Sequence, residues 1–259
     1  MMSRSTTAVA VGCSLMLGAV AARAQTRPST QSLEMDLSAA SSARTDAAVS
    51  PNRFDGFGSD LAVTYFSRLK RADLRVTARG GFRALRSLTP SGVAPSTERT
   101  AQAEVVLDAF RAPPPALLRP ELGVEVRAGG LLIAHQSPGV GSTSFGFAAA
   151  TLGPVFVWPH ANRLGLFELT GGIAAIGLVT QPYENLRNVS PPPATRGATI
   201  ASLQSFQTAL RYSPRGTWLG SRFSYEYRAG LLRYAGDSPV RELTQALSVG
   251  LALGGRSPR

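Results

Sequence analysis

The chain has 259 residues, one cysteine and a formal net charge of +11. After residue 24, no apolar run approaches the roughly 18 residues that a transmembrane helix needs. The one cysteine, Cys13, precedes that point, so the rest of the chain can form neither disulfides nor thiolate metal sites. Composition therefore argues against a helical membrane protein and against a disulfide-stabilised domain.

The first 24 residues have the three parts of a secretory signal. Arg4 supplies the positive start, residues 8–22 form the apolar stretch, and Ala22-Arg23-Ala24 is an A-x-A cleavage site. A lipoprotein signal is the alternative, but it would need a longer apolar run before the cysteine. We expect residues 1–24 to be a cleaved signal peptide, followed by a disordered segment over residues 25–30.

Most of the remaining chain alternates apolar residues with small or polar ones, which is the period of a β-strand. Breaks rich in Pro, Gly, Ser and Asn separate the alternating stretches. In chain order, strands are expected at residues 59–69, 72–85, 98–111, 119–134, 144–158, 163–180, 199–212, 219–234 and 240–254.

The breaks between these stretches alternate in length. The breaks at 70–71, 112–118, 159–162 and 213–218 are short, and those at 86–97, 135–143 and 181–198 are longer. Periplasmic turns and extracellular loops alternate in this way in outer-membrane β-barrels, and single-chain bacterial barrels have an even number of strands. A tenth strand is therefore expected around residues 33–37, followed by a long break over 40–58.

In this pattern the mature chain resembles the class of small bacterial outer-membrane β-barrel proteins. The resemblance implies an all-β fold, a closed antiparallel transmembrane barrel of about ten strands, with eight as the fallback. The barrel is expected over residues 31–254, with a C-terminal tail over 255–259 and both termini in the periplasm. A soluble periplasmic β-sandwich that binds a ligand is a second alternative.

The two faces of the expected strands differ in polarity. Residues predicted to face lipid are Leu74, Val76, Ala78, Leu122, Val124, Val126, Phe223, Tyr225, Tyr227, Leu247, Val249, Leu251 and Leu253. The opposite face carries charges, and a narrow lumen tolerates charges only when they are paired. Predicted lumen ion-pair residues are Arg75, Arg79, Glu104, Glu125, Arg127, Glu168, Arg222, Glu226 and Arg228. A structural plug of ion pairs is the first interpretation, and a narrow anion-preferring pore is the alternative.

The charge balance indicates the partners. Without Arg4 and Arg23 the chain keeps 25 basic and 16 acidic side chains, a net charge of +9. The arginines are spread singly along the strands, which does not match a nucleic-acid-binding helix. Phosphate-rich outer-membrane lipid and lipopolysaccharide are the expected partners, and no nucleic acid is expected.

One short motif could carry catalysis. His135 and Ser137 are two residues apart on one strand and face the same side, so the imidazole could activate the hydroxyl. The segment resembles the His-x-Ser element of the outer-membrane lipid A deacylases, which implies lipid A ester hydrolysis as the alternative function. Pro138 stands where that family has Asn, and no Asp or Glu lies between Glu125 and Glu168 to orient the histidine.

A second catalytic interpretation concerns the same rim. Omptins, ten-stranded surface proteases, carry paired acids and an Asp/His pair at the top of the barrel, where Asp55, Asp60, Asp237 and His135 could lie. No two of these aspartates are adjacent. The leading prediction is therefore a non-enzymatic outer-membrane barrel with a structural, adhesive or small-solute role, without metal or cofactor.

Overall fold

The computed structural model describes residues 31–46, 50–69, 72–87, 95–111, 120–138, 141–181, 194–216, 221–235 and 239–253. The predicted signal peptide, the segment 25–30 and the tail 255–259 lie outside these residues. In the described part of the chain, no helix is long and apolar enough to cross a membrane.

The described residues form twelve β-strands. They are β1 (Gln31–Asp46), β2 (Ser50–Arg68), β3 (Ala72–Ser87), β4 (Thr97–Arg111), β5 (Glu121–Ser137), β6 (Gly141–Ala161), β7 (Gly165–Ile173), β8 (Ile176–Gln181), β9 (Ala194–Thr199), β10 (Leu203–Pro214), β11 (Arg222–Tyr234) and β12 (Val240–Leu253).

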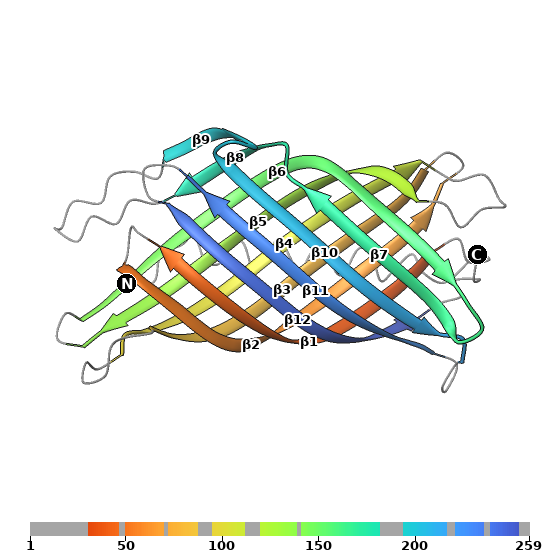
Figure 1. Cartoon of the computed structure of the whole chain (residues 1–259), viewed down its shortest axis with the longest axis horizontal. Helices are drawn as coiled ribbons and strands as arrows, with labels where there is room; N and C mark the ends of the chain where they lie inside the picture. The colour runs from red at the N-terminus through yellow and green to blue at the C-terminus, as the bar shows by residue number, and fades with distance from the viewer. Residues whose placement is uncertain are drawn as a thin grey trace.

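Ten of these strands close into a ring. The order runs β5-β4-β3-β2-β1-β12-β11-β10-β7-β6, and β6 pairs with β5 to complete it. All neighbours are antiparallel, and the strands are tilted around a common axis (Figure 1). The predicted closed ten-stranded barrel is confirmed. The eight-stranded fallback is wrong, and closure of the sheet excludes the two-sheet sandwich.

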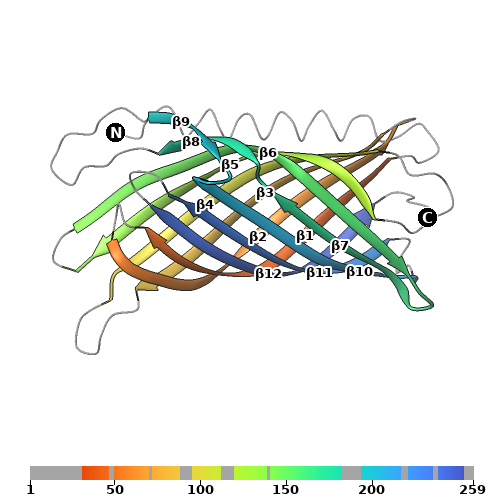
Figure 2. The same cartoon turned by 45° about the horizontal axis from the view of Figure 1, so that its top comes forward.

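Two strands that the sequence predicts as continuous are interrupted. The stretch 163–180 divides into β7 and β8, and the stretch 199–212 corresponds to β10 and the end of β9. The interruption lies opposite Gly153 and Pro154 of β6, which pairs with β8 before this point and with β7 after it. Proline has no N–H for the ladder, and a Cβ at Gly153 would overlap the backbone of Ile173. The hairpin β8–β9 bends away here (Figure 2).

The first two strands are longer than expected. The predicted break over 40–58 is wrong, because β1 runs to Asp46 and β2 begins at Ser50. Ala40 and Ser42 continue the inward-facing row of β1 and are each 3% exposed. Small residues can form such a row as readily as large ones, but they give little hydrophobic contrast in the sequence.

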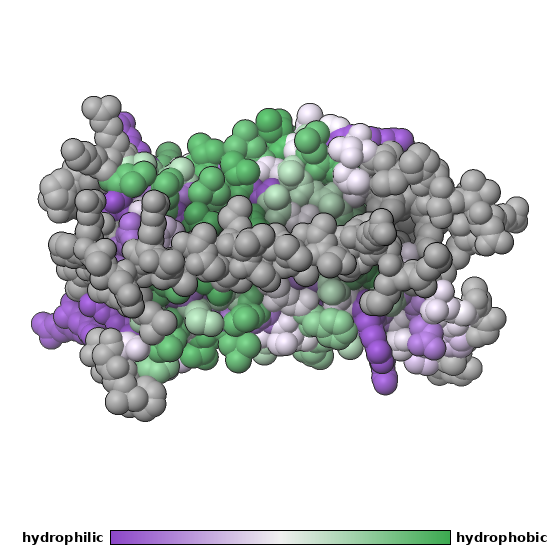
Figure 3. Space-filling model, turned by 180° about the vertical axis from the view of Figure 1, so that it is seen from behind, coloured by the Kyte–Doolittle hydropathy of each residue, from purple (hydrophilic) through white to green (hydrophobic). Residues whose placement is uncertain are grey.

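The two faces of the wall separate as predicted. Leu122, Leu247 and Val249 point outward, with exposures of 74%, 66% and 49%. Hydrophobic residues occupy most of the middle of the visible surface and hydrophilic ones gather towards the ends (Figure 3). This outward apolar belt on a closed barrel is the architecture of a transmembrane β-barrel of the outer-membrane type.

Candidate functional site in the lumen

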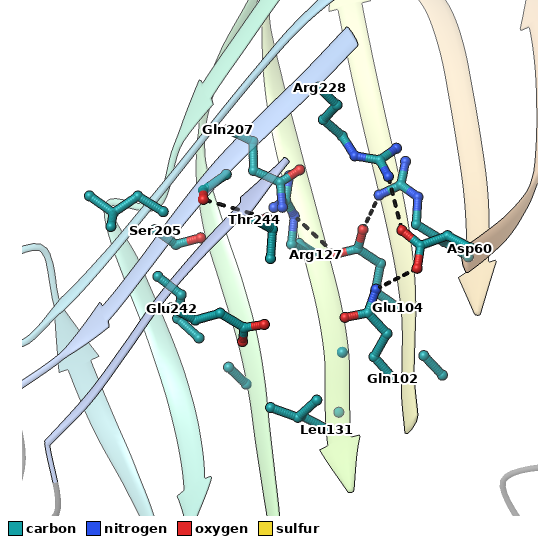
Figure 4. A pocket seen from close by; sticks show the side chains of 18 of the residues that line it. Asp60, Gln102, Glu104, Arg127, Leu131, Ser205, Gln207, Arg228, Glu242 and Thr244 are labelled. Atoms are coloured by element: carbon teal, nitrogen blue, oxygen red, sulfur yellow. Dashed lines mark hydrogen bonds and ion pairs between the residues drawn. The ribbon is translucent and has the colours of Figure 1, made fainter. Parts of the chain in front are cut away.

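The centre of the lumen contains a buried carboxylate that joins four strands. Asp60 of β2 is 1% exposed. It accepts hydrogen bonds from Arg83 Nη2 of β3 at 3.1 Å and from Gln102 Nε2 of β4 at 3.1 Å. Arg228 Nη2 of β11 donates to the same carboxylate at 3.3 Å. Because β11 is three strands from β2 in the ring, this last contact crosses the lumen (Figure 4).

A second group of ion pairs lies along the neighbouring wall. Arg79 and Glu104 stand opposite each other on β3 and β4 and form an ion pair. Arg127 of β5 lies between two carboxylates, with Nη2 2.8 Å from Glu125 Oε1 and Nε 3.9 Å from Glu104 Oε2. Cations and anions therefore alternate along this part of the wall.

A third group lies nearer the end of the barrel where β1 begins and β12 ends. Arg75 Nε of β3 donates to Asp108 Oδ2 of β4 at 2.7 Å, and Asp108 is 2% exposed. Glu34 of β1 pairs with Arg211 of β10 and accepts a hydrogen bond from Ser224 Oγ at 2.7 Å. Arg75 and Asp108 lie on adjacent strands, whereas the two Glu34 contacts join strands that are not neighbours and so hold the lumen together across its width.

The ion pairs divide the lumen into separate spaces. A cavity of about 160 Å³ and one of about 90 Å³ share Arg79, Arg127 and Arg228 as lining residues. The second shares Arg75 and Arg211 with a cavity of about 530 Å³ at the end where β1 begins and β12 ends. Most of the shared residues are charged, with Gln207 and Phe66 as the uncharged ones, so the ion-pair layers form most of the partitions between the spaces.

Some buried donors at these partitions have no protein acceptor among the described residues. They include Nε and Nη1 of Arg83 and Nε of Arg79. Both arginines line the cavity of about 160 Å³, which also has the carboxylates of Asp60 and Glu104 in its wall and is large enough to hold water. The arrangement therefore fits a lumen with a few enclosed waters between fixed ion pairs.

An apolar layer occupies the opposite end of the lumen. Its buried residues come from seven strands and are Leu131, Ile133, Phe147, Val179, Ala198, Leu203, Tyr234 and Val240. The rings of Phe147 on β6 and Tyr234 on β11 lie 6.1 Å apart between their centroids. The hairpin β8–β9 supplies Val179 and Ala198, so the bent hairpin still contributes to this layer.

The structure brings together most of the lumen residues that the sequence singles out. Arg79 pairs with Glu104, Arg127 with Glu125, and Arg228 Nη1 lies 3.4 Å from Glu226 Oε1. The other three predicted lumen residues are Arg75, Glu168 and Arg222. Arg75 pairs with Asp108, whereas Glu168 and Arg222 line the cavity of about 530 Å³.

The most connected residue, Asp60, is not among the predicted lumen ion-pair residues and was considered only for an omptin-like site at the rim. Asp60, together with Glu34, Asp108, Arg83 and Arg211, forms the contacts that cross or brace the lumen. All five occupy inward-facing positions of the alternating pattern, so the pattern predicts that their side chains point into the lumen. The Glu34–Arg211 and Asp60–Arg228 pairs join strands far apart in the sequence, and the alternating pattern alone does not identify such pairs.

The His-x-Ser element lies at the lumen rim, at the end of the barrel opposite the start of β1 and the end of β12. His135 is 8% exposed, and its Nδ1 lies 3.3 Å from Oε1 of the buried Glu98 on the adjacent strand β4. An acid for the histidine is thus supplied by a neighbouring strand. The Ser137 hydroxyl lies 3.2 Å from that of Ser96. Both members of the element face the lumen, whereas acyl chains of a lipid would lie on the outer face.

The acids considered for an omptin-like site are separated. Asp60 points inward to the ion pairs described above, while Asp55 lies on the outer face with Oδ1 3.0 Å from Arg53 Nε. Asp237 lies outside the described residues. Within the described part of the chain, no group of three or more His, Cys, Asp or Glu residues is placed to hold a metal ion.

No protein-family model and no curated protein matches the chain. Among solved structures, it is similar to the outer membrane protease OmpT from Escherichia coli, with 8% identity, coverage of 86% of this chain and 95% of that one, and a TM-score of 0.48. It is also similar to the translocator domain of the autotransporter NalP from Neisseria meningitidis, with 13% identity, coverage of 97% and 98%, and a TM-score of 0.49.

A third similar structure is Ail, the attachment invasion locus protein of Yersinia pestis, with 12% identity, coverage of 86% and 98%, and a TM-score of 0.37. These three proteins are named for different roles, as a protease, a translocator domain and an attachment protein. The strand pairing itself defines the fold. The chain is a closed, ten-stranded antiparallel barrel of the outer-membrane type, with a lumen crossed by ion pairs.

Proposed function

We propose that this chain is a non-enzymatic, structural barrel of the outer membrane whose lumen is closed to ions. The observation that carries the proposal is the buried carboxylate of Asp60, bound by Arg83, Gln102 and Arg228 from three other strands. In a narrow lumen, such charges are held by their partners and do not form a hydrated path.

The apolar layer supports closure at the other end of the lumen. Leu131, Phe147 and Tyr234 belong to a cluster of buried residues on strands from both sides of the ring. Hydrophobic constrictions block ions because water and ions are unstable in them. A solute would have to pass both the ion-pair layers and this apolar layer, so a small-solute role is the less favoured one.

The proposal includes the location of the chain and its processing. Residues 1–24 are the export signal, residues 25–30 precede the barrel, and residues 255–259 follow it as a periplasmic tail. The outward apolar belt supports the proposal that outer-membrane lipid and lipopolysaccharide surround the barrel. The barrel then stands as a stable element of the membrane, with its loops available for structural or adhesive contacts.

Conductance tests the closed lumen. The purified mature protein, folded into planar lipid bilayers, is expected to give no discrete current steps above those of the bilayer alone. Folding is checked beforehand by its anomalous migration in unboiled samples on detergent gels. Steady, anion-selective current steps from the folded protein would contradict closure and favour the arginine-lined pore.

Lipid A analysis tests the enzyme alternative. Expression of the protein is expected to leave lipid A acylation unchanged, and Ser137→Ala is expected to have no effect on it. The reason is that His135 and Ser137 face the lumen, while the ester bonds of lipid A lie outside the barrel wall. Mass spectrometry of lipid A checks this. Loss of an ester-linked acyl chain that depends on Ser137 would establish the hydrolase.

A further inference from the structure

Two arginines stand directly opposite each other on the outer face of the barrel. Arg233 of β11 and Arg241 of β12 are register partners and both are exposed. Thr45 of β1 is the next register partner of Arg241, and Arg53 of β2 is the next after Thr45. Three guanidinium groups therefore lie in one row over four adjacent strands, which neighbour each other in Figure 1.

Arg233 and Arg241 repel each other, and the described residues do not compensate this repulsion. Like charges directly opposite each other on one face of a sheet destabilise the pairing. Arg53 is compensated by Asp55, which lies 3.0 Å away. Among the described residues, no carboxylate forms an ion pair with Arg233 or Arg241. An external anion would therefore relieve the repulsion.

The surface next to this pair is apolar. Leu231 and Leu243 are register partners two residues along the same strands, on the same face as the arginines. Two residues of a strand correspond to about 7 Å. Leu247, four residues beyond Leu243 on the same face of β12, is 66% exposed. The arginines thus form the polar border of the hydrophobic belt.

The position along the barrel indicates which leaflet meets this border. Leu33 and Leu253 are register partners, so β1 begins and β12 ends at the same end of the barrel. Arg233 and Arg241 lie at the other end, beside the connection between β11 and β12. With both termini in the periplasm, as in the proposed placement, the arginine pair lies at the level of the outer leaflet.

We propose that Arg233 and Arg241 form a binding site for the phosphate group of a phosphorylated lipid of the outer leaflet, the class to which lipid A belongs. Guanidinium groups bind phosphate through paired, charge-assisted hydrogen bonds, and two of them can share one phosphate. The acyl chains of the lipid lie against Leu231, Leu243 and Leu247. The inference rests on the proposed outer-membrane placement but not on the closed lumen.

Native mass spectrometry of the mature, folded protein in detergent tests this site. The probe is lipid A that carries both phosphates, and the comparison lipid is the same lipid A after enzymatic dephosphorylation. The Arg233→Gln/Arg241→Gln double variant is expected to bind the phosphorylated lipid roughly tenfold or more weakly than the native protein. Dephosphorylated lipid A is expected to bind the two proteins equally.

Arg111→Gln is the matched control. Arg111 is an exposed arginine at the end of β4, and it lies at the opposite end of the barrel from Arg233 and Arg241. It is expected to keep native binding of phosphorylated lipid A. Equal binding by the native protein and the double variant would overturn the site, as would full competition by millimolar inorganic phosphate, which would indicate a free-phosphate site. The gel shift of unboiled samples reports folding of each variant, and conductance reports the lumen, so failure of this inference is distinguishable from failure of the proposed function.

Discussion

Replacing Asp60 by alanine is expected to destabilise the barrel by about 3–5 kcal/mol, the cost of removing one partner from a buried ion pair. The variant leaves the guanidinium groups of Arg83 and Arg228, with side chains 3% and 13% exposed, without their shared carboxylate. Gln102 also loses its acceptor. Urea titration of folding into lipid vesicles measures the change in the free energy of unfolding.

Asp55→Ala is the control for this prediction. Asp55 also pairs with an arginine, Arg53, but on the outer face, where the two side chains are 34% and 61% exposed. Exposed ion pairs contribute about 0.2–1 kcal/mol. A similar loss of stability for the two variants would mean that the Asp60 contacts across the lumen do not hold the barrel together.

Most of the fold can be predicted from the alternation of apolar and polar residues along single strands. Leu122, Val124 and Val126 are separated by lumen-facing residues, and this period of two can be recognised without knowing any strand partner. The strand number was predicted from alternating lengths of the breaks, but the strand bounds do not keep that alternation. Residues 138–140 separate β5 from β6, where a long break was predicted, and residues 112–120 separate β4 from β5, where a short one was predicted. The strands at Ala40 and Ser42 were missed because small residues on both faces carry too little contrast.

The site was harder to predict because its contacts depend on register and on closure. Arg79 and Glu104 face each other only because β3 and β4 pair at that register. Asp60 and Arg228 are 168 residues apart and meet because the ring brings β2 and β11 within reach across the lumen. Alternation indicates which side chains point inward, but it does not indicate which of them meet there.

Val249→Arg is expected to destabilise the barrel by about 2–4 kcal/mol, because an arginine on the lipid face near the bilayer midplane loses its hydration without gaining a partner. Val249 points outward, 49% exposed, between Leu37 and Tyr225 on the neighbouring strands. The matched control is Gln245→Arg, on the same face four residues towards the arginine border.

A charge at position 245 lies closer to the headgroups, where the cost falls to about 0–1 kcal/mol. Gly250, the lumen-facing neighbour of Val249, is not a neutral control, because a Cβ there would overlap the side chains of Asp36 and Ser224. The same vesicle titration measures both arginine variants. Equal costs at positions 245 and 249 would show that depth in the membrane does not set the penalty. A negligible cost at both would place this face of β12 away from lipid, and the outward belt would then need another partner than the bilayer.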